Sequence, residues 1–183
     1  RLSLVGSEMC IRDRDKGAHV IALSRNPEKV RNVPKNVTTK KMNVLDRDAL
    51  EQFFQEVGEY DILVNSATGG ARAVGPFLSM DLDGYRASFD KLWGYTNVVR
   101  YGTKHLKDNG NIVLVSGSPA RKCRPGQIAI SSVGGAVEAF ARGIAPEIAP
   151  KRINIVSPGI IDTPMSPLPV SYTHLRAHET KAN

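Results

Sequence analysis

The sequence predicts an α/β fold in which a parallel sheet forms the core. Short apolar runs rich in β-branched residues alternate with longer stretches of helical pattern, and Gly, Pro or small polar residues close each run. The clearest runs are 111–115 and 152–156, which flank a Gly- and Ala-rich helical stretch at 127–149. Continuous apolar runs of this length are typical of strands that are buried on both faces of a parallel sheet. In such sheets, ligands bind where the strands end and the loops begin.

The composition indicates one globular domain and argues against several functional classes. The chain has 183 residues, of which 41% are hydrophobic and 23% charged, and this is ordinary for a domain with a single core. No apolar run approaches the roughly 18 residues that cross a bilayer. The two cysteines, Cys10 and Cys123, form neither a disulfide framework nor a metal-ligand spacing. We therefore expect no membrane association, no metal site and a cytoplasmic location.

The net charge of +7 raises the question of nucleic-acid binding. The basic residues are scattered along the chain, and aromatic residues do not interleave with them as a base-stacking surface requires. We expect no nucleic-acid partner.

The two ends of the chain fit poorly with the sequence between them. Residues 2–13 and 170–180 are similar to translated sequencing-adapter read-through. The alternative is a genuine variable terminus at each end. We expect residues 1–14 and 169–183 to be non-native segments, and residues 15–168 to form one partial domain.

The hydrophobic pattern places the main elements. Strands are expected near residues 18–24, 37–42, 61–65, 110–116 and 152–157. Asp46 is a suitable N-cap for a helix with an apolar stripe at i, i+3, i+4 and i+7, formed by Leu50, Phe53, Phe54 and Val57. A long helix is expected from about residue 81 to residue 106. Its inward face would consist of Tyr85, Phe89, Leu92, Trp93 and Thr96.

Two motifs carry a family resemblance. Residues 152–159 read Arg-Ile-Asn-Ile-Val-Ser-Pro-Gly and are followed by Asp-Thr-Pro at 162–164, and residues 65–70 read Asn-Ser-Ala-Thr-Gly-Gly. With these motifs the chain resembles the short-chain dehydrogenase/reductase family over about residues 15–167. The resemblance implies a Rossmann-like, doubly wound parallel sheet in a three-layer arrangement. That sheet would be incomplete, since the first strand and the C-terminal part are missing or replaced, and the central position must be filled by residues 2–5 or left open.

The cofactor preference is predicted from the end of the strand near 18–24. An acidic residue there binds the ribose 2′-hydroxyl, whereas an Arg accommodates a 2′-phosphate, and the chain has Ser24 and Arg25. We predict NADP(H), with NAD less favoured; a merely solvated Arg is the alternative. The resemblance adds further cofactor contacts at Asn43, Val44, Asn65, Ser66, Ala67, Pro158, Gly159, Ile161 and Thr163. Asn65 is expected to brace the sheet rather than to touch a substrate.

One part of a dinucleotide site has no counterpart in the sequence. A Gly-rich phosphate turn and a full helix should follow the first strand. Only ten residues separate Gly6 from Gly17, which is too few for both. We therefore expect residues 1–183 alone to bind a dinucleotide weakly.

The family's catalytic residues are also absent. A reductase of this family uses a Tyr whose pKa is lowered by a Lys four residues later, a Ser that polarises the carbonyl, and a supporting Asn on the preceding helix. In the order Ser, Tyr, Lys and Asn, the aligned positions are Gly117, Ile130, Gly134 and Lys91. Lys91 is a candidate acid if it reaches the crevice, and a flanking Ser could hydrogen-bond a carbonyl. The candidate serines, which could equally be local turn formers, are Ser116 and Ser118.

Two functions follow from the resemblance. The first is a fragment of an NADP(H)-dependent oxidoreductase that acts on a small carbonyl or alcohol substrate. The second is a catalytically inactive nucleotide-binding sensor or scaffold protein of the same fold. In this family the helix expected at 81–106 often forms a dimer interface, so Tyr85 and Trp93 could be contact residues. A homo-oligomer is therefore expected for the complete parent protein.

Overall fold

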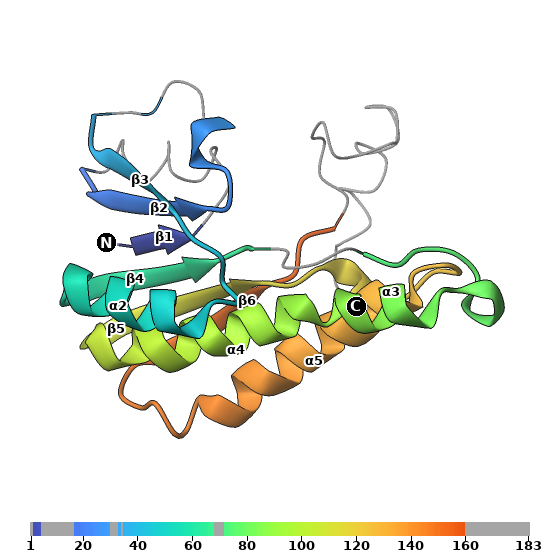
Figure 1. The fold of residues 1–183 in the computed structure, drawn as a ribbon. Helices are drawn as coiled ribbons and strands as arrows, with labels where there is room; N and C mark the ends of the chain where they lie inside the picture. Colours follow the sequence, from blue (N-terminus) through green and yellow to red (C-terminus); the bar gives the residue numbers. More distant parts are fainter. Residues whose placement is uncertain (1, 5–16, 30–32, 34, 68–71, 160–183) are drawn as a thin grey trace.

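The computed structural model describes residues 2–4, 17–29, 33, 35–67 and 72–159. Six parallel strands form one sheet in the order β3-β2-β1-β4-β5-β6 (Figure 1). The predicted parallel sheet is confirmed, and each predicted strand is found within a few residues of its expected position. The strands are β1 (Leu2–Leu4), β2 (Val20–Ser24), β3 (Val37–Lys41), β4 (Tyr60–Asn65), β5 (Leu106–Val115) and β6 (Arg152–Val156).

The central position of the sheet is filled by β1. Leu2 lies opposite Ile21 of β2 and opposite Leu63 of β4, and both pairings are parallel. β2 and β3 therefore lie on one side of β1, while β4, β5 and β6 lie on the other. This reversal of strand order is the doubly wound, Rossmann-like arrangement, and it is the point at which such sheets bind ligands.

Three long helices cover one face of the sheet. α2 (Arg47–Val57), α4 (Asp90–Gly102) and α5 (Ile128–Ile144) lie side by side on this face (Figure 1). The helices of the opposite face would belong to the connections from β1 to β2 and from β2 to β3; most of the first connection and a small part of the second lie outside the described residues. The third layer therefore stays a prediction. The shorter elements are α3 (Leu82–Ser88), η1 (Pro27–Lys29), η2 (Phe77–Ser79), η3 (Thr103–His105) and η4 (Ser118–Ala120).

The helix predicted after Asp46 is confirmed. The backbone N–H of Ala49 donates to Oδ1 of Asp46 at 3.0 Å, which caps the first turn of α2. Leu50 and Phe54 are completely buried, so the predicted stripe forms part of the core. Behind it, the Tyr60 hydroxyl donates to the Gly102 carbonyl at 2.6 Å, and burial raises the pKa of Tyr60 far above its usual value.

The prediction of one helix from residue 81 to residue 106 was wrong. The helix ends at Ser88 and restarts as α4, and α4 ends at Gly102. Trp93, predicted to face inward, is 60% exposed. The sheet-facing stripe instead contains two glycines that allow close approach, because a Cβ at Gly94 would lie 2.5 Å from Cγ2 of Val44. A Cβ at Gly102 would lie 2.7 Å from the Tyr60 hydroxyl.

The strand β6 also differs from the prediction. Its residues alternate between exposed and half-buried, with Arg152, Asn154 and Val156 exposed. Complete burial on both faces was expected. The physical reason is that β6 is the last strand in the order, so in the described part of the sheet it is an edge.

Two negative findings concern the described residues. None of their helices is long and apolar enough to cross a membrane. Their His, Cys, Asp and Glu side chains form no group of three or more that could hold a metal ion.

Candidate functional site

The described residues predicted to bind the cofactor lie at or directly after the ends of the strands. Because all strands are parallel, the loops after β2, β3, β4, β5 and β6 leave from the same, carboxyl edge. The backbone N–H of Ser116 donates to the Val156 carbonyl, and that of Ser118 donates to the Pro158 carbonyl, both at 2.9 Å. The pairing of β5 with β6 thus continues into the two loops predicted to line one crevice. Gly159 follows in the same loop and is exposed, whereas Ile161 and Thr163 lie outside the described residues.

The two residues at the end of β2 have different environments. The backbone N–H of Asn26 donates to Oγ of Ser24 at 3.1 Å, so the Ser24 hydroxyl helps to form the turn. Arg25 is exposed. An exposed guanidinium at this strand end is compatible with a contact to an incoming phosphate.

The turn after β3 is fixed on α4. Oδ1 of Asn43 accepts a hydrogen bond from the Leu45 backbone at 3.1 Å, and the Val44 carbonyl accepts one from Nδ2 of Asn97 at 3.1 Å. The Val44 side chain is buried against Gly94. The structure therefore makes the Val44 side chain a packing residue.

Asn65, the last residue of β4, holds an unsatisfied donor. Its side chain is completely buried, and its Oδ1 accepts from the Ala67 backbone at 3.1 Å. Its Nδ2 has no hydrogen-bond partner among the described residues. A buried amide donor without an acceptor is costly. Since Asn65 lies opposite Leu4 of β1, this donor stands at the reversal of strand order.

The loop after β5 packs directly on α5. Ser116 is buried, and its hydroxyl donates to the Gly134 carbonyl at 3.3 Å. A Cβ at Gly134 would lie 2.9 Å from Cβ of Ala120 and 3.2 Å from Oγ of Ser116. A side chain at Gly134, the position aligned with the family's Lys, would therefore press on Ala120 and Ser116.

The other aligned positions carry no proton-transfer group. Gly117 has a φ of −178°, an extended conformation that any residue can adopt. Ile130 is half-buried on α5. Ser118 is half-buried at the start of η4, and it is the serine of this loop that lies nearest to the Pro158 segment.

Lys91 is brought to the carboxyl end of β5. Its Nζ lies 5.3 Å from the centroid of the Tyr95 ring, and the Tyr95 hydroxyl donates to the Val115 carbonyl at 2.7 Å. Burial and then the positive charge of Arg72 lower the pKa of Lys91 to about 8. Burial also raises the pKa of Tyr95 well above its usual value, so its phenol is not a suitable proton donor.

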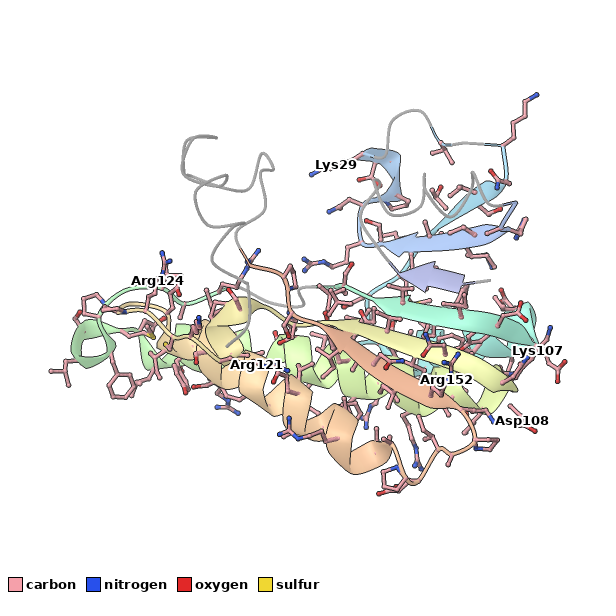
Figure 2. The ribbon with its side chains drawn as sticks, turned by 180° about the vertical axis from the view of Figure 1, so that it is seen from behind. Lys29, Lys107, Asp108, Arg121, Arg124 and Arg152 are labelled. Carbon is pink, nitrogen blue, oxygen red and sulfur yellow. The ribbon has the colours of Figure 1, made fainter. Side chains whose placement is uncertain are left out.

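Sequence reasoning missed a buried carboxylate on α5. Glu138 accepts hydrogen bonds from Oγ of Ser157 at 2.9 Å and from Nε of Arg121 at 3.1 Å. Burial alone would raise the pKa of Glu138, but these hydrogen bonds and the charges of Arg121 and Arg142 outweigh it and lower the pKa. Figure 2 shows Arg121 beside α5, on the loop that follows β5. Glu138 thus links the loops after β5 and β6 to α5. In the sequence, the only signal for this role is that Glu138 lies one helical turn after Gly134.

The described residues fit a dinucleotide at two places. Nδ2 of Asn65 is a buried donor in need of an acceptor, and Arg25 is exposed at the end of β2. Residues 5–16, which follow β1, lie outside the described residues.

A doubly wound parallel sheet with polar strand ends at its carboxyl edge is the arrangement found in dinucleotide-binding α/β proteins. The family model described as enoyl-(acyl carrier protein) reductase matches residues 5–181. The chain belongs to the short-chain dehydrogenase/reductase family of oxidoreductases, as the sequence motifs indicated.

Relatives and a solved structure show the same family. The chain is 31% identical over 166 residues to 2,3-dihydro-2,3-dihydroxybenzoate dehydrogenase of Bacillus subtilis, covering 82% of this chain and 63% of that protein. It is 30% identical over 159 residues to L-xylulose reductase of Bos taurus, covering 81% and 64%. A short chain dehydrogenase from Burkholderia cenocepacia, solved in complex with NADP, has a TM-score of 0.82 at 25% identity, covering 99% of this chain and 84% of that chain.

The chain spans about half to two thirds of the length of the curated relatives that it matches. The activity, the substrate and the partners of the whole protein are therefore matters for a proposal.

Proposed function

We propose that the chain belongs to an NADP(H)-dependent oxidoreductase that interconverts a small carbonyl compound and an alcohol, with Lys91 as the proton donor. The observation that carries this proposal is the half-buried Lys91 ammonium beside the carboxyl end of β5. Its pKa of about 8 lies close to neutral pH, where general acids work best.

The cofactor part of the proposal rests on the ends of β2 and β4. Arg25 would meet the 2′-phosphate that distinguishes NADP(H) from NAD(H), because an Arg–phosphate contact is a strong, charge-assisted one. Asn65 would direct its unpartnered Nδ2 towards the bound nucleotide. The NADP found in the similar Burkholderia cenocepacia structure supports this cofactor.

NADPH, when bound, would supply the hydride for the carbonyl carbon. The hydroxyl of Ser118 would hydrogen-bond the carbonyl oxygen and orient it, since the Ser116 proton is already donated to the Gly134 carbonyl. The Lys91 ammonium would transfer a proton to the oxygen as charge develops there. The resulting amine would then recover a proton from solvent.

The test is a pH profile of carbonyl reduction by the complete gene product. Arg72, from the loop after β4, is the charged group that acts on Lys91, and Tyr95, on α4 itself, is the titratable group beneath it. We expect the rate to fall as pH rises through about 8, because the amine cannot donate a proton. Lys91→Met should lower kcat/KM by about a hundredfold or more. The exposed Lys41→Met is the control, and wild-type activity in Lys91→Met would refute the role.

A second candidate is an inactive nucleotide-binding sensor or scaffold, favoured by the close packing at Gly134. A Cβ at Gly134, the position aligned with the family's Lys, would lie close to Ala120 and Ser116. This candidate predicts that NADPH quenches or shifts the fluorescence of the protein, while a panel of carbonyls and alcohols gives no turnover. Turnover that is lost in Lys91→Met would favour the oxidoreductase.

We also propose self-association through the outer surface of α3 and α4. A surface hollow of about 490 Å³ is lined by Tyr85, Arg86, Phe89, Asp90 and Trp93. Phe77 and Leu78, on η2, are also exposed, and the Phe77 and Tyr85 rings lie 6.4 Å apart. Clustered exposed apolar side chains mark interaction surfaces. Analytical ultracentrifugation should show a dimer that Trp93→Glu converts to monomers, and an unchanged mass would refute it.

The segment boundaries are a further proposal. Residues 1–14 and 169–183 would be non-native, although Leu2–Leu4 pairs in the centre of the sheet. Amplification and sequencing of the gene across both ends is the test, and recovery of the printed termini would refute the proposal. A cytoplasmic location would be tested by cell fractionation.

A further inference from the structure

A closed ring of hydrogen bonds joins the loops after β5 and β6 to α5. In this ring Oε1 of Glu138 accepts from Oγ of Ser157 at 2.9 Å, and Oε2 accepts from Nε of Arg121 at 3.1 Å. Ser157 precedes Pro158, whose carbonyl accepts from the Ser118 N–H at 2.9 Å. The Ser118 carbonyl accepts in turn from the Arg121 N–H at 3.0 Å, which closes the ring. This Glu138 ring, which consists of these five residues, spans one helix and two loops.

The carboxylate of Glu138 is buried and serves both loops at once. Glu138 is 7% exposed and is the only acidic residue of α5, and its neighbours Val137 and Ala141 are buried apolar residues. A buried carboxylate is tolerated where a cation and hydrogen-bond donors satisfy it. Here each oxygen receives one donor, and the two donors come from different loops. Packing of α5 needs only an apolar side chain at this place, whereas fixing one loop relative to the other needs the carboxylate.

The ring fixes the backbone of Ser118. Its N–H donates to Pro158, and its carbonyl accepts from Arg121 and also from the Lys122 N–H at 2.9 Å. The Ser118 hydroxyl takes no part in the ring. On the other side of the ring, Pro158 and Gly159 belong to the loop predicted to contact the cofactor. The ring therefore joins the serine proposed to orient the substrate carbonyl to the loop proposed to hold the cofactor.

We propose that Glu138 is a positioning residue, which sets the distance between the Ser118 hydroxyl and the cofactor loop at Pro158 and Gly159. This inference rests on the proposed oxidoreductase function, in which Ser118 orients the carbonyl. Glu138 acts through Arg121 and Ser157 and does not itself contact either reactant. Its effect is to hold the loop of the substrate against the loop of the cofactor.

The geometry of carbonyl reduction makes this distance important. The carbonyl carbon must lie next to the hydride donor while Ser118 holds the carbonyl oxygen, and a displacement of about 1 Å can lower the rate of such a step about a hundredfold. With the ring open, Ala120 still packs near Gly134, but the loop after β6 loses its link to Arg121. We therefore expect kcat to fall while the fold persists.

The first experiment measures carbonyl reduction by the complete gene product at saturating NADPH and substrate. Glu138→Met removes both hydrogen bonds of the carboxylate and should lower kcat about ten- to a hundredfold. Ser157→Ala opens the ring at one point, so it should also lower kcat and should add no further loss to Glu138→Met. The control is Tyr60→Phe, which loses the buried hydrogen bond to Gly102 at the start of β4. It should lower the Tm and leave kcat unchanged, whereas a wild-type kcat in Glu138→Met would overturn the proposal.

The second experiment tests whether Glu138 acts through Ser118. Ser118→Ala should lower kcat about tenfold in the wild type, the weight of one hydrogen bond to the carbonyl. In the Glu138→Met background it should have little further effect, because residues of one network are not additive. Equal factors in the two backgrounds would overturn the positioning role while leaving the oxidoreductase function standing. Wild-type activity in Ser118→Ala would also overturn it, because Glu138 would then have no catalytic group to position.

The third experiment needs no turnover. The amide hydrogen of Ser118 is bonded to the Pro158 carbonyl, and Glu138→Met should speed its exchange with deuterated solvent about tenfold, the weight of one hydrogen bond. Tyr60→Phe is again the control and should leave this rate unchanged, because loop amides exchange by local opening. An unchanged rate in Glu138→Met would overturn the proposal. Faster exchange in a protein that reduces no carbonyl would support the positioning role and refute the oxidoreductase function.

Discussion

The two parts of the carboxyl edge differ in what their polar groups do. At the ends of β2 and β4, Arg25 is exposed and Nδ2 of Asn65 has no partner among the described residues. At the ends of β5 and β6, Ser116 is bonded to Gly134, and Glu138 binds the loops on both sides. The first part therefore offers groups to a ligand, whereas the second uses most of its polar groups to hold the loops on α5.

Lys91 is the exception in the second part. It is partly desolvated, and the charge that acts on it, Arg72, is repulsive. The lowered pKa of Lys91 means that folding disfavours its charged form. Lys91 belongs to none of the ion pairs among the described residues, so this part of the edge keeps one charged group that the loops do not use.

The largest expected effect concerns the nucleotide-binding part. Arg25→Asp should shift the preference from NADPH towards NADH by about a hundredfold, roughly 3 kcal/mol, because it removes a charge-assisted contact and adds repulsion. The measurement is the ratio of the two Kd values by fluorescence titration. An unchanged ratio would show that Arg25 is a surface residue without a role in cofactor binding. The ends of β2 and β4 would then not differ in role from the ends of β5 and β6.

The next effect concerns the brace at Glu138. Glu138→Gln should lower the free energy of unfolding at pH 7 by about 2 kcal/mol. Both carboxylate oxygens of Glu138 accept hydrogen bonds, whereas the NH2 group of Gln cannot accept one and would face a donor. The pKa of Glu138 is depressed in the folded protein, so its contribution is present above the ordinary pKa of 4.5 and is lost as pH falls below it. Urea unfolding at several pH values would measure this. The exposed Glu147→Gln is the control, and a pH-independent difference would refute the assignment.

A smaller effect tests the packing at Gly134. Gly134→Ala should lower the free energy of unfolding by about 1–2 kcal/mol, because its Cβ would lie 2.9 Å from Ala120. Gly135 is the matched control on the same helix, with no atom within 4 Å of a built Cβ. Gly135→Ala should raise stability by about 0.5–1 kcal/mol through the loss of backbone freedom. Equal effects of the two changes would show that η4 moves aside at little energetic cost. A Lys side chain in place of Gly134 could then be accommodated.

The smallest effect is a gain in stability. Lys91→Met should raise the free energy of unfolding at pH 7 by about 1 kcal/mol, because a desolvated ammonium is replaced by an apolar side chain of similar length. The folded pKa of about 8 lies below the ordinary 10.5, so the unfolded chain binds more protons between these values. Wild-type stability should therefore rise with pH across this window, and that of Lys91→Met should not. A loss of stability in Lys91→Met would make the residue a structural one.

The sequence by itself determined the sheet and several of its local features. The apolar runs before Ser24, Asn65 and Ser116 became parallel strands, since such runs can be buried only between two layers. Asp46 became the N-cap of α2 because capping involves only residues within one turn. The residues that follow each strand came to one edge as a direct result of parallel pairing.

Only the tertiary structure decided which groups at that edge are satisfied and which are not. Whether Trp93 faces inward depended on the approach of Gly94 to Val44, and these residues are far apart in the sequence. The Glu138 brace and the close packing of Gly134 on Ala120 are likewise contacts between separate elements. Hydrophobic period and capping describe the local chain, whereas burial of a charge or an amide depends on every element packed around it.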